Sequence, residues 1–276
     1  ISILKDADLE DLNEDELLEH LNFSNDSREN DTLIPETGNL ASGLQMLNIK
    51  WGDIFQQTFP EMGNIRITPT EVGKVISSFK NDSSPGPSTE NKKLYFLLFA
   101  KIPNIFSSLC QSLLDNQDFS GDFSYLKKRS IVMIQKNSNR KPSPKDFRPI
   151  SLLEILYKIL AKLLLYRVRE LLPKIVNNHQ FGCIPDRCMS TCSGSLLRVI
   201  EEINSSGTKA QILSLDIQAA FDSMFTDVIH EITNYLFPNS NIPDILNSLT
   251  TGGQGFLSIG GKKSDIFSLT KGSGQG

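Results

Sequence analysis

Ser214-Leu215-Asp216-Ile217-Gln218-Ala219-Ala220-Phe221-Asp222 places one carboxylate at the end of a short apolar run and an aromatic ring five residues later. The run from Gln211 to Leu215 has the length and composition of a buried strand, so Asp216 is expected where that strand meets its loop. A carboxylate there can hold Mg²⁺, which takes one or two protein carboxylates and fills its other positions with water and phosphate oxygens. Phe221 would then lie against a sugar, where a bulky ring rejects a 2′-hydroxyl. The alternative is that Asp216 only caps the next helix.

Two cations lie upstream, on either side of a polar loop. Lys136 ends an apolar segment, and Arg148 follows the loop Asn137 to Lys145. Arginine offers a planar fork to phosphate oxygens and lysine a compact charge, so together they can offset the charge that develops on a leaving pyrophosphate. Pro149 restricts Arg148 to an extended conformation. The alternative is a surface arginine paired with Asp146.

The spacing of apolar residues predicts the elements around these motifs. Thr68-Pro69-Thr70-Glu71 is typical of a helix start. We expect Asp222 to cap a helix through Val228 and Ile229. The other expected elements are a helical region at Leu94 to Leu114 that is broken or kinked at Pro103, a strand at Ile131 to Ile134, helices at Glu154 to Leu172 and Ser193 to Ile203, and a glycine-rich hairpin at Gly252 to Gly261.

Charge is distributed unevenly along the 276 residues, although the net value is only −4. The segment Ile1 to Thr32 holds eleven acidic residues against Lys5 and Arg28. The segment Lys127 to Arg187 holds fourteen basic residues against four acidic ones, which can neutralise several phosphates. A solvated helix face beside a polar loop is the alternative explanation of this basic segment.

The four cysteines are too few and too irregular for a disulfide framework, so a reducing compartment is expected. His179 lies near Cys183, Cys188 and Cys192, which raises zinc as an alternative, but the spacing fits no standard zinc module. No apolar run is long enough to cross a bilayer, and no signal peptide is visible, so no membrane partner is expected. The first residue, Ile1, suggests a piece of a longer chain.

Taken together, three motifs carry a resemblance to a known family. The stretch Ser214 to Asp222 resembles the first palm motif of reverse transcriptases, and its Ala-Phe-Asp ending is most similar to the non-LTR, LINE-type retrotransposon branch. The sequence Phe-Arg-Pro-Ile-Ser-Leu at Phe147 to Leu152, a Lys-rich amphipathic helix, and then Gln180-Phe181-Gly182 resemble the fingers of the same polymerases. The glycine-rich stretch Leu269 to Gly276 resembles their next palm motif.

This resemblance implies an α+β fold: a right-hand polymerase with mostly helical fingers, a small antiparallel sheet and a partial palm. Residues 1–39 would be an acidic, disordered arm, residues 40–205 the fingers, and residues 206–276 the partial palm, which ends within the Gln-Gly motif. Ser84-Pro85-Gly86-Pro87 is similar to the family's turn upstream of the fingers. Ser88 stands where the family usually carries Asp, and Cys183 replaces an aromatic residue, so contacts at both positions are open.

The resemblance also implies site roles. The function would be RNA-directed DNA polymerisation, in which an RNA template, a DNA primer and a dNTP meet at Mg²⁺ or Mn²⁺, inside the cell in the nucleus or cytoplasm. Asp216 would be the catalytic carboxylate, and it would bind the metals together with the carbonyl of Ile217. The nucleotide would contact Lys136, Arg148, Phe221 and Gln275, and the template would contact Gln180 and Arg187.

One departure bears on activity. Family members place an aromatic-x-Asp-Asp hairpin after this point, and no adjacent Asp-Asp pair occurs in the chain. Because the second carboxylate anchor of a two-metal site is missing, this segment alone is expected to be inactive. The alternative functions are a non-catalytic nucleic-acid-binding relic or repurposed module, and a structural subunit.

Overall fold

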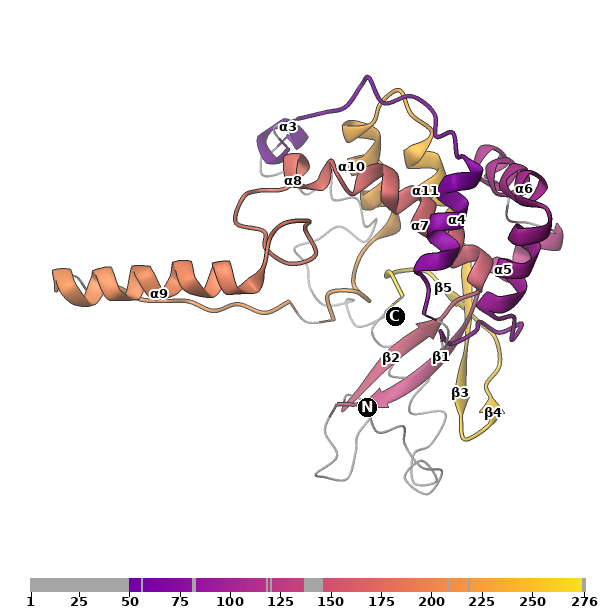
Figure 1. Ribbon diagram of the computed structural model, residues 1–276. Helices are drawn as coiled ribbons and strands as arrows, with labels where there is room; N and C mark the ends of the chain where they lie inside the picture. The colour runs from indigo at the N-terminus through magenta and orange to yellow at the C-terminus, as the bar shows by residue number, and fades with distance from the viewer. Residues whose placement is uncertain are drawn as a thin grey trace.

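The computed structural model describes residues 50–55, 57–80, 83–117, 119, 121–136, 146–207, 209–217 and 219–274. Most of the helices gather into one layer, a small sheet extends from one side of it, and one long helix projects away (Figure 1). Helices with a small sheet agree with the expected α+β class. The expected arm, residues 1–39, and the nucleotide residue Gln275 lie outside the described residues.

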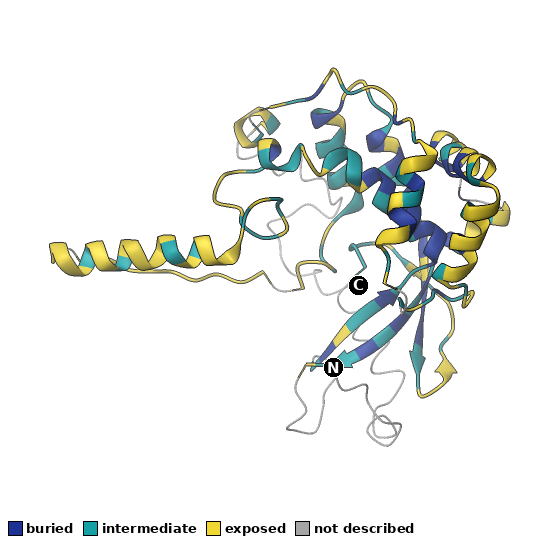
Figure 2. Ribbon diagram, viewed as in Figure 1, coloured by how far each residue is buried: buried dark blue, intermediate teal, exposed yellow. Residues whose placement is uncertain are grey.

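Helix α7 (Ile155–Val168) forms the centre of the core, as its apolar spacing predicts. It buries side chains on several sides, because α4 (Pro69–Ser78) and α5 (Lys92–Lys101) contact it. Figure 2 shows these buried segments as the darkest part of the helical layer. The helix is shorter than expected: it ends at Val168, and a separate turn, α8 (Leu172–Ile175), carries Pro173 where proline is tolerated. The buried residues of α7 are Ile155, Leu156, Tyr157, Ile159, Leu160, Leu163 and Leu164.

The predicted starts and breaks of the first helices are confirmed. The Thr68 hydroxyl accepts a hydrogen bond from the Glu71 backbone N–H, and Glu71 Oε2 accepts one from the Thr68 N–H at 2.8 Å, which is a capping box. The region with Pro103 divides into α5 and α6 (Pro103–Asn116), bent by 116° relative to each other. Among the described residues no single helix passes the length and hydropathy test for a membrane span, and this bent pair passes it only when taken together.

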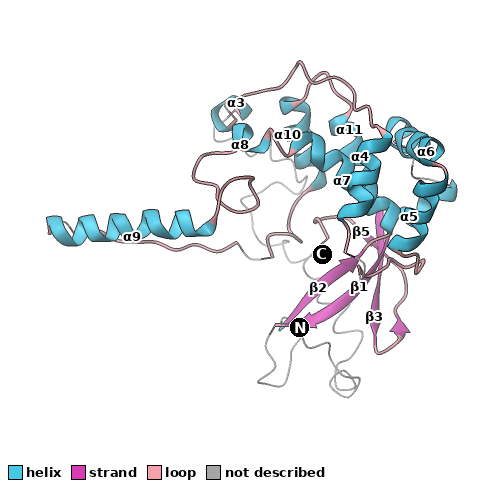
Figure 3. Cartoon of the chain, viewed as in Figure 1, coloured by secondary structure: helices cyan, strands magenta, loops and turns pink. Residues whose placement is uncertain are grey.

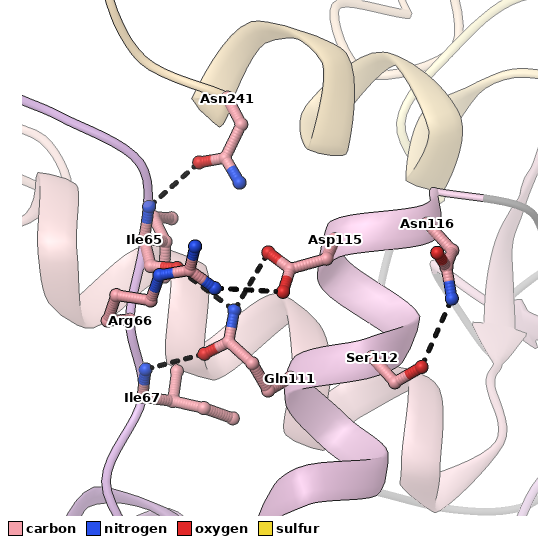
Figure 4. Close-up of polar contacts among 8 residues, drawn as sticks. All are labelled: Ile65, Arg66, Ile67, Gln111, Ser112, Asp115, Asn116 and Asn241. Atoms are coloured by element: carbon pink, nitrogen blue, oxygen red, sulfur yellow. Dashed lines mark hydrogen bonds and ion pairs between the residues drawn. The ribbon is translucent and has the colours of Figure 1, made fainter.

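Polar contacts fix the segment before α4 against two helices (Figure 4). The Gln111 side chain accepts a hydrogen bond from the Ile67 N–H at 2.8 Å and donates one to the Ile65 carbonyl at 3.0 Å. Asn241, at the start of α11 (Ile242–Thr250), accepts from the Ile65 N–H at 2.8 Å. These bonds connect an extended strip of backbone to both α6 and α11, and α11 packs against α10 (Thr226–Leu236). The described residues also form the short helix α3 (Trp51–Ile54) and the 3₁₀ helix Gly121–Lys127.

The sheet is mixed, so the expectation of a purely antiparallel sheet is wrong. Its strands run in the order β2-β1-β3-β4, with β5 also paired to β3. The β1–β3 pair is parallel because the helical layer connects the two strands and returns the chain in the same direction. The expected strand Ile131 to Ile134 lies within β1, and the glycine hairpin is confirmed as β3–β4 with positive φ at Gly260 and Gly261. The strands are β1 (Lys128–Gln135), β2 (Phe147–Leu152), β3 (Gly253–Ile259), β4 (Lys262–Lys263) and β5 (Phe267–Leu269).

The strand expected at Gln211 to Leu215 is absent, which corrects the prediction around Asp216. Residues 209–217 form no strand (Figure 3), and Leu213 and Leu215 are 80% and 83% exposed. A strand needs a partner for its backbone hydrogen bonds, and none of the described strands pairs with this segment. The preceding helix α9 (Met189–Ser206) covers the expected 193–203 helix, but it also has no buried residue.

Candidate functional site

Lys136 and Arg148 lie on one hairpin, as expected of a pair that shares a ligand. Ile134 is the register partner of Arg148, and the Lys136 N–H donates to the Asp146 carbonyl at 2.7 Å, which continues the ladder by one pair. Because side chains alternate between the faces of a strand pair, Lys136 and Arg148 are diagonal neighbours on the same face. Both residues are exposed, and the opposite face buries Ile131, Met133 and Phe147. The loop 137–145 between them lies outside the described residues.

Phe221 and the glycine-rich stretch are hydrogen-bonded to each other. The Ser273 N–H donates to the Phe221 carbonyl at 2.9 Å, and the Gly272 N–H donates to the Met224 carbonyl at 2.8 Å. Gly272 has a φ of +83°, and a Cβ there would lie 2.9 Å from the Cα of Asp222. Only glycine fits such a position without strain. Two motifs that lie about fifty residues apart in the sequence therefore meet in one turn.

The glycine-rich stretch then continues onto the sheet. A Cβ on Gly274 would lie 2.7 Å from the Ser151 hydroxyl and 2.9 Å from the Arg129 guanidinium. Ser151 belongs to β2 and Arg129 to β1, and both side chains are buried. The backbone next to Gln275 is thereby held on the opposite face of the hairpin that carries Lys136 and Arg148.

Asp216 and Ile217 lie apart from these contacts, in the exposed stretch after α9. Among the described residues, no three His, Cys, Asp or Glu side chains lie close enough together to hold a metal ion, which applies to Asp216 and to the cysteine-containing segment alike. The donor set around Asp216 therefore does not fit a metal ion by itself. Asp222 does not cap α10, which corrects the expectation, because the N-cap of this helix is Phe225. The Asp222 N–H donates to the Ala219 carbonyl at 2.9 Å in a turn.

Gln180 and Arg187 occupy one loop between α8 and α9. The Arg187 guanidinium donates to the backbone carbonyls of Asn177 at 2.6 Å, Gln180 at 2.9 Å and Pro173 at 3.0 Å. These bonds stabilise the loop, so Arg187 has a structural function in addition to the expected template contact. Gln180 is exposed, and its side-chain amide donates weakly to the Gly182 carbonyl at 3.4 Å.

Glu154 resolves the open position at Ser88. The Glu154 carboxylate is 1% exposed, and it accepts hydrogen bonds from the Ser88 N–H at 2.8 Å and the Ser88 hydroxyl at 2.6 Å. The carboxylate that holds the Ser84-to-Ser88 turn is thus supplied by Glu154, the N-cap of α7, and not by position 88 itself. Lys158 donates to the Ser84 carbonyl at 3.0 Å; burial lowers the pKa of its ammonium group, and Glu154 partly opposes that shift.

Sequence reasoning missed both Glu154 and Arg129 as structural positions. Each was counted only as a charge in the segment Lys127 to Arg187. The available signal was a charged residue beside an apolar run: Glu154 follows Leu152 and Leu153, and Arg129 alternates with Ile131 and Met133 on one face of β1. Such a residue is buried only with compensating contacts, and those contacts come from segments distant in sequence.

Comparison with known proteins identifies the family of this chain. Residues 134–276, just over half of the chain, match the family model described as reverse transcriptase (RNA-dependent DNA polymerase). The chain belongs to the reverse transcriptase family, and the resemblance inferred from the motifs is confirmed at that level.

A relative in Drosophila melanogaster has the name "Probable RNA-directed DNA polymerase from transposon BS". It is 24% identical over 184 residues, which are 65% of this chain and 20% of the relative. The chain therefore spans about a fifth of the length of that relative.

Cysteine reactivity offers a check of the local environments. Burial raises the pKa of the Cys110 thiol to about 12, whereas a hydrogen bond with the Thr191 hydroxyl lowers the pKa of the exposed Cys188 thiol. The thiolate is the reactive form, so Cys188 becomes nucleophilic at a lower pH than Cys110 does. We expect iodoacetamide at pH 8 to label Cys188 readily and to leave Cys110 unlabelled in the native chain, as measured by peptide mass spectrometry. Equal labelling of Cys110 in native and urea-treated protein would contradict its burial.

Proposed function

We propose that this chain is the fingers and partial palm of a LINE-type RNA-directed DNA polymerase, with residues 40–205 as fingers and 206–276 as partial palm. In the complete enzyme, a primer 3′-hydroxyl would attack the α-phosphate of a dNTP paired with an RNA template. The observation that supports this most is the turn in which Ser273 and Gly272 bond to Phe221 and Met224 against the β1–β2 hairpin. The LINE type is supported by the motif at Phe147 to Leu152 and by the Ala-Phe-Asp ending.

Different residues would contact different parts of the nucleotide and the template. Lys136 and Arg148, exposed on one face of the hairpin, would bind the triphosphate and offset charge on the leaving pyrophosphate. Phe221 would lie against the deoxyribose, and Gln275 would contact the base. Gln180 and Arg187 would lie along the template. Positioning and charge compensation are most of what a protein supplies to phosphoryl transfer.

Asp216 is the proposed catalytic carboxylate, and with the carbonyl of Ile217 it would contribute ligands to Mg²⁺ or Mn²⁺. Since the described residues include no group of three His, Cys, Asp or Glu side chains that could hold a metal ion, further protein ligands would come from elsewhere. We therefore derive no metal-dependent step from this chain.

Sugar selection tests the assignment of Phe221. We expect Phe221→Val to increase incorporation of ribonucleotides relative to deoxyribonucleotides by about tenfold or more, because a smaller side chain leaves room for a 2′-hydroxyl. The measurement is the ratio of kcat/KM for dCTP and CTP in primer extension by a protein that contains this chain and continues through an aromatic-x-Asp-Asp hairpin. Phe225→Val is the matched control, since the Phe225 ring packs under the Lys271 ammonium group at 5.5 Å instead of facing the proposed sugar. An unchanged ratio would remove Phe221 from the site.

A second function is favoured by one observation: among the described residues, no group of three His, Cys, Asp or Glu side chains could hold a metal ion. A non-catalytic nucleic-acid-binding module would keep the basic segment Lys127 to Arg187 without completing a metal site. Both functions predict RNA binding that weakens steeply with salt. Primer extension by the longer protein separates them, because only the polymerase elongates a primer on an RNA template.

A further inference from the structure

Arg129 is the most unusual charged residue of the described chain. Its side chain is 6% exposed, on the buried face of β1, and its Nε has no hydrogen-bond partner. Burying a guanidinium with a donor unpaired costs free energy, so such a residue is retained where its remaining contacts compensate. If position 129 served only to pack the sheet, an apolar side chain would stabilise the fold more than an arginine does.

Small residues from three segments lie next to Arg129. The buried Tyr157 is also close: burial raises the pKa of its hydroxyl, and the positive charge of Arg129 opposes part of that shift. A Cβ on Gly274 would lie 2.9 Å from one terminal nitrogen of the guanidinium, and a Cβ on Gly253 would lie 3.5 Å from the other. Ser151, the cross-strand neighbour of Ile131, borders the same space, since its hydroxyl lies 2.7 Å from the Gly274 Cβ position. The guanidinium therefore fills the volume that two missing side chains leave.

Arg129 lies next to both parts of the proposed nucleotide site, although Gly274 and the cations Lys136 and Arg148 are on opposite faces of the β1–β2 hairpin. Arg129 is on the strand that leads directly to Lys136, and Gly274 immediately precedes Gln275. Gly274 also follows Ser273, whose N–H bonds to the Phe221 carbonyl. A shift of the guanidinium would therefore move the Gly272-to-Gly274 backbone by direct contact. This backbone is bonded to Phe221 and leads to Gln275.

We propose that Arg129 is a positioning residue for deoxynucleoside triphosphate binding: it holds the Gly272-to-Gly274 backbone against the β1–β2 hairpin, and its unpaired Nε–H donates a hydrogen bond to a carbonyl of that backbone when the nucleotide binds. The planar, always charged guanidinium suits this function, because it presents several donors in fixed directions. The inference rests on the proposed function for its substrate class. Arg129 touches neither substrate nor metal in this scheme.

The main test uses the longer, polymerase-competent protein and compares Arg129→Met, Arg129→Lys and wild type. We expect Arg129→Met to raise KM for dNTP by about tenfold or more, with kcat and the dissociation constant for template–primer changed less than about twofold. Arg129→Lys should recover part of the loss because it keeps the charge. Arg198→Met, which removes an exposed arginine on α9, is the matched control and should leave all three constants unchanged.

Gly274→Ala gives an independent variant if Arg129→Met does not fold. Its Cβ would press on Ser151 and Arg129, so it should raise KM for dNTP in the same way. The inference is overturned if folded Arg129→Lys and Gly274→Ala proteins keep the wild-type KM, or if kcat, KM and template affinity all decline together with thermal stability, as for a purely structural residue.

Hydrogen exchange separates failure of this inference from failure of the proposed function. In the 276-residue chain, the Gly272 and Ser273 amides should exchange faster in Arg129→Met than in wild type, whether or not any polymerase activity exists. If the longer wild-type protein does not extend primers but this difference is present, the proposed function fails and the seating contact stands. If exchange of these amides is unchanged, the seating contact is refuted.

Discussion

Asp216→Asn is expected to abolish primer extension by the longer protein, with a loss on the order of 10³-fold or more in kcat. The substitution keeps the size of the side chain and removes the negative charge on which the proposed catalytic function of Asp216 depends, and a loss of about 10³-fold corresponds to about 4 kcal/mol of transition-state stabilisation. Single-turnover extension of a DNA primer on an RNA template measures the effect directly.

Because Asp216 is exposed, an effect of its substitution on activity can be separated from an effect on stability. The stretch 209–217 contributes nothing to the buried core, so Asp216→Asn should leave the thermal unfolding midpoint and the affinity for template–primer unchanged. Asp265→Asn, at another exposed carboxylate, is the matched control and should retain full activity. Extension that survives in Asp216→Asn would refute the catalytic function of this residue.

Gly86→Ala is expected to lower the free energy of unfolding by about 2–4 kcal/mol. A Cβ on Gly86 would lie 2.6 Å from the Glu154 N atom and 2.7 Å from its Cα. The Ser84-to-Ser88 turn must therefore move away from the start of α7. That movement breaks the two hydrogen bonds from Ser88 to the buried Glu154 carboxylate and leaves the carboxylate without these donors. Urea denaturation followed by circular dichroism measures the change.

Gly63→Ala is the matched control for this position. A Cβ on Gly63 would meet no atom within 4 Å, so the substitution should be neutral or stabilise by less than about 1 kcal/mol. If Gly86→Ala were as stable as Gly63→Ala, the contact between the Ser84-to-Ser88 turn and Glu154 would not exist in solution.

Local signals predicted most of the helical layer. The capping box at Thr68 and Glu71, the break at Pro103 and the periodic α7 each depend on residues within a few positions of one another. The sequence placed Lys136 and Arg148 on either side of a loop, but their position on one face of a hairpin became visible only from the register of β1 and β2.

Features that depend on distant segments were predicted poorly. The run at Gln211 to Leu215 has the composition of a strand, but pairing needs a neighbour, and no sequence window shows whether one is present. The parallel β1–β3 pair follows from the path of the chain through the helical layer. The contacts of Glu154 with Ser88, and of Arg129 with Gly274, join residues separated by 66 and by more than a hundred positions.

The isolation of the Asp216 stretch and α9 from the core has a practical consequence for selection experiments. A screen that scores abundance or melting temperature responds to α7 and its neighbours. It is insensitive to substitutions in residues 189–207 and 209–217, because none of these residues is buried. Sequence drift in this part of the chain would remove the proposed catalytic carboxylate while the protein continued to accumulate at normal levels. If the proposed function holds, loss of activity and loss of the protein are separate evolutionary events.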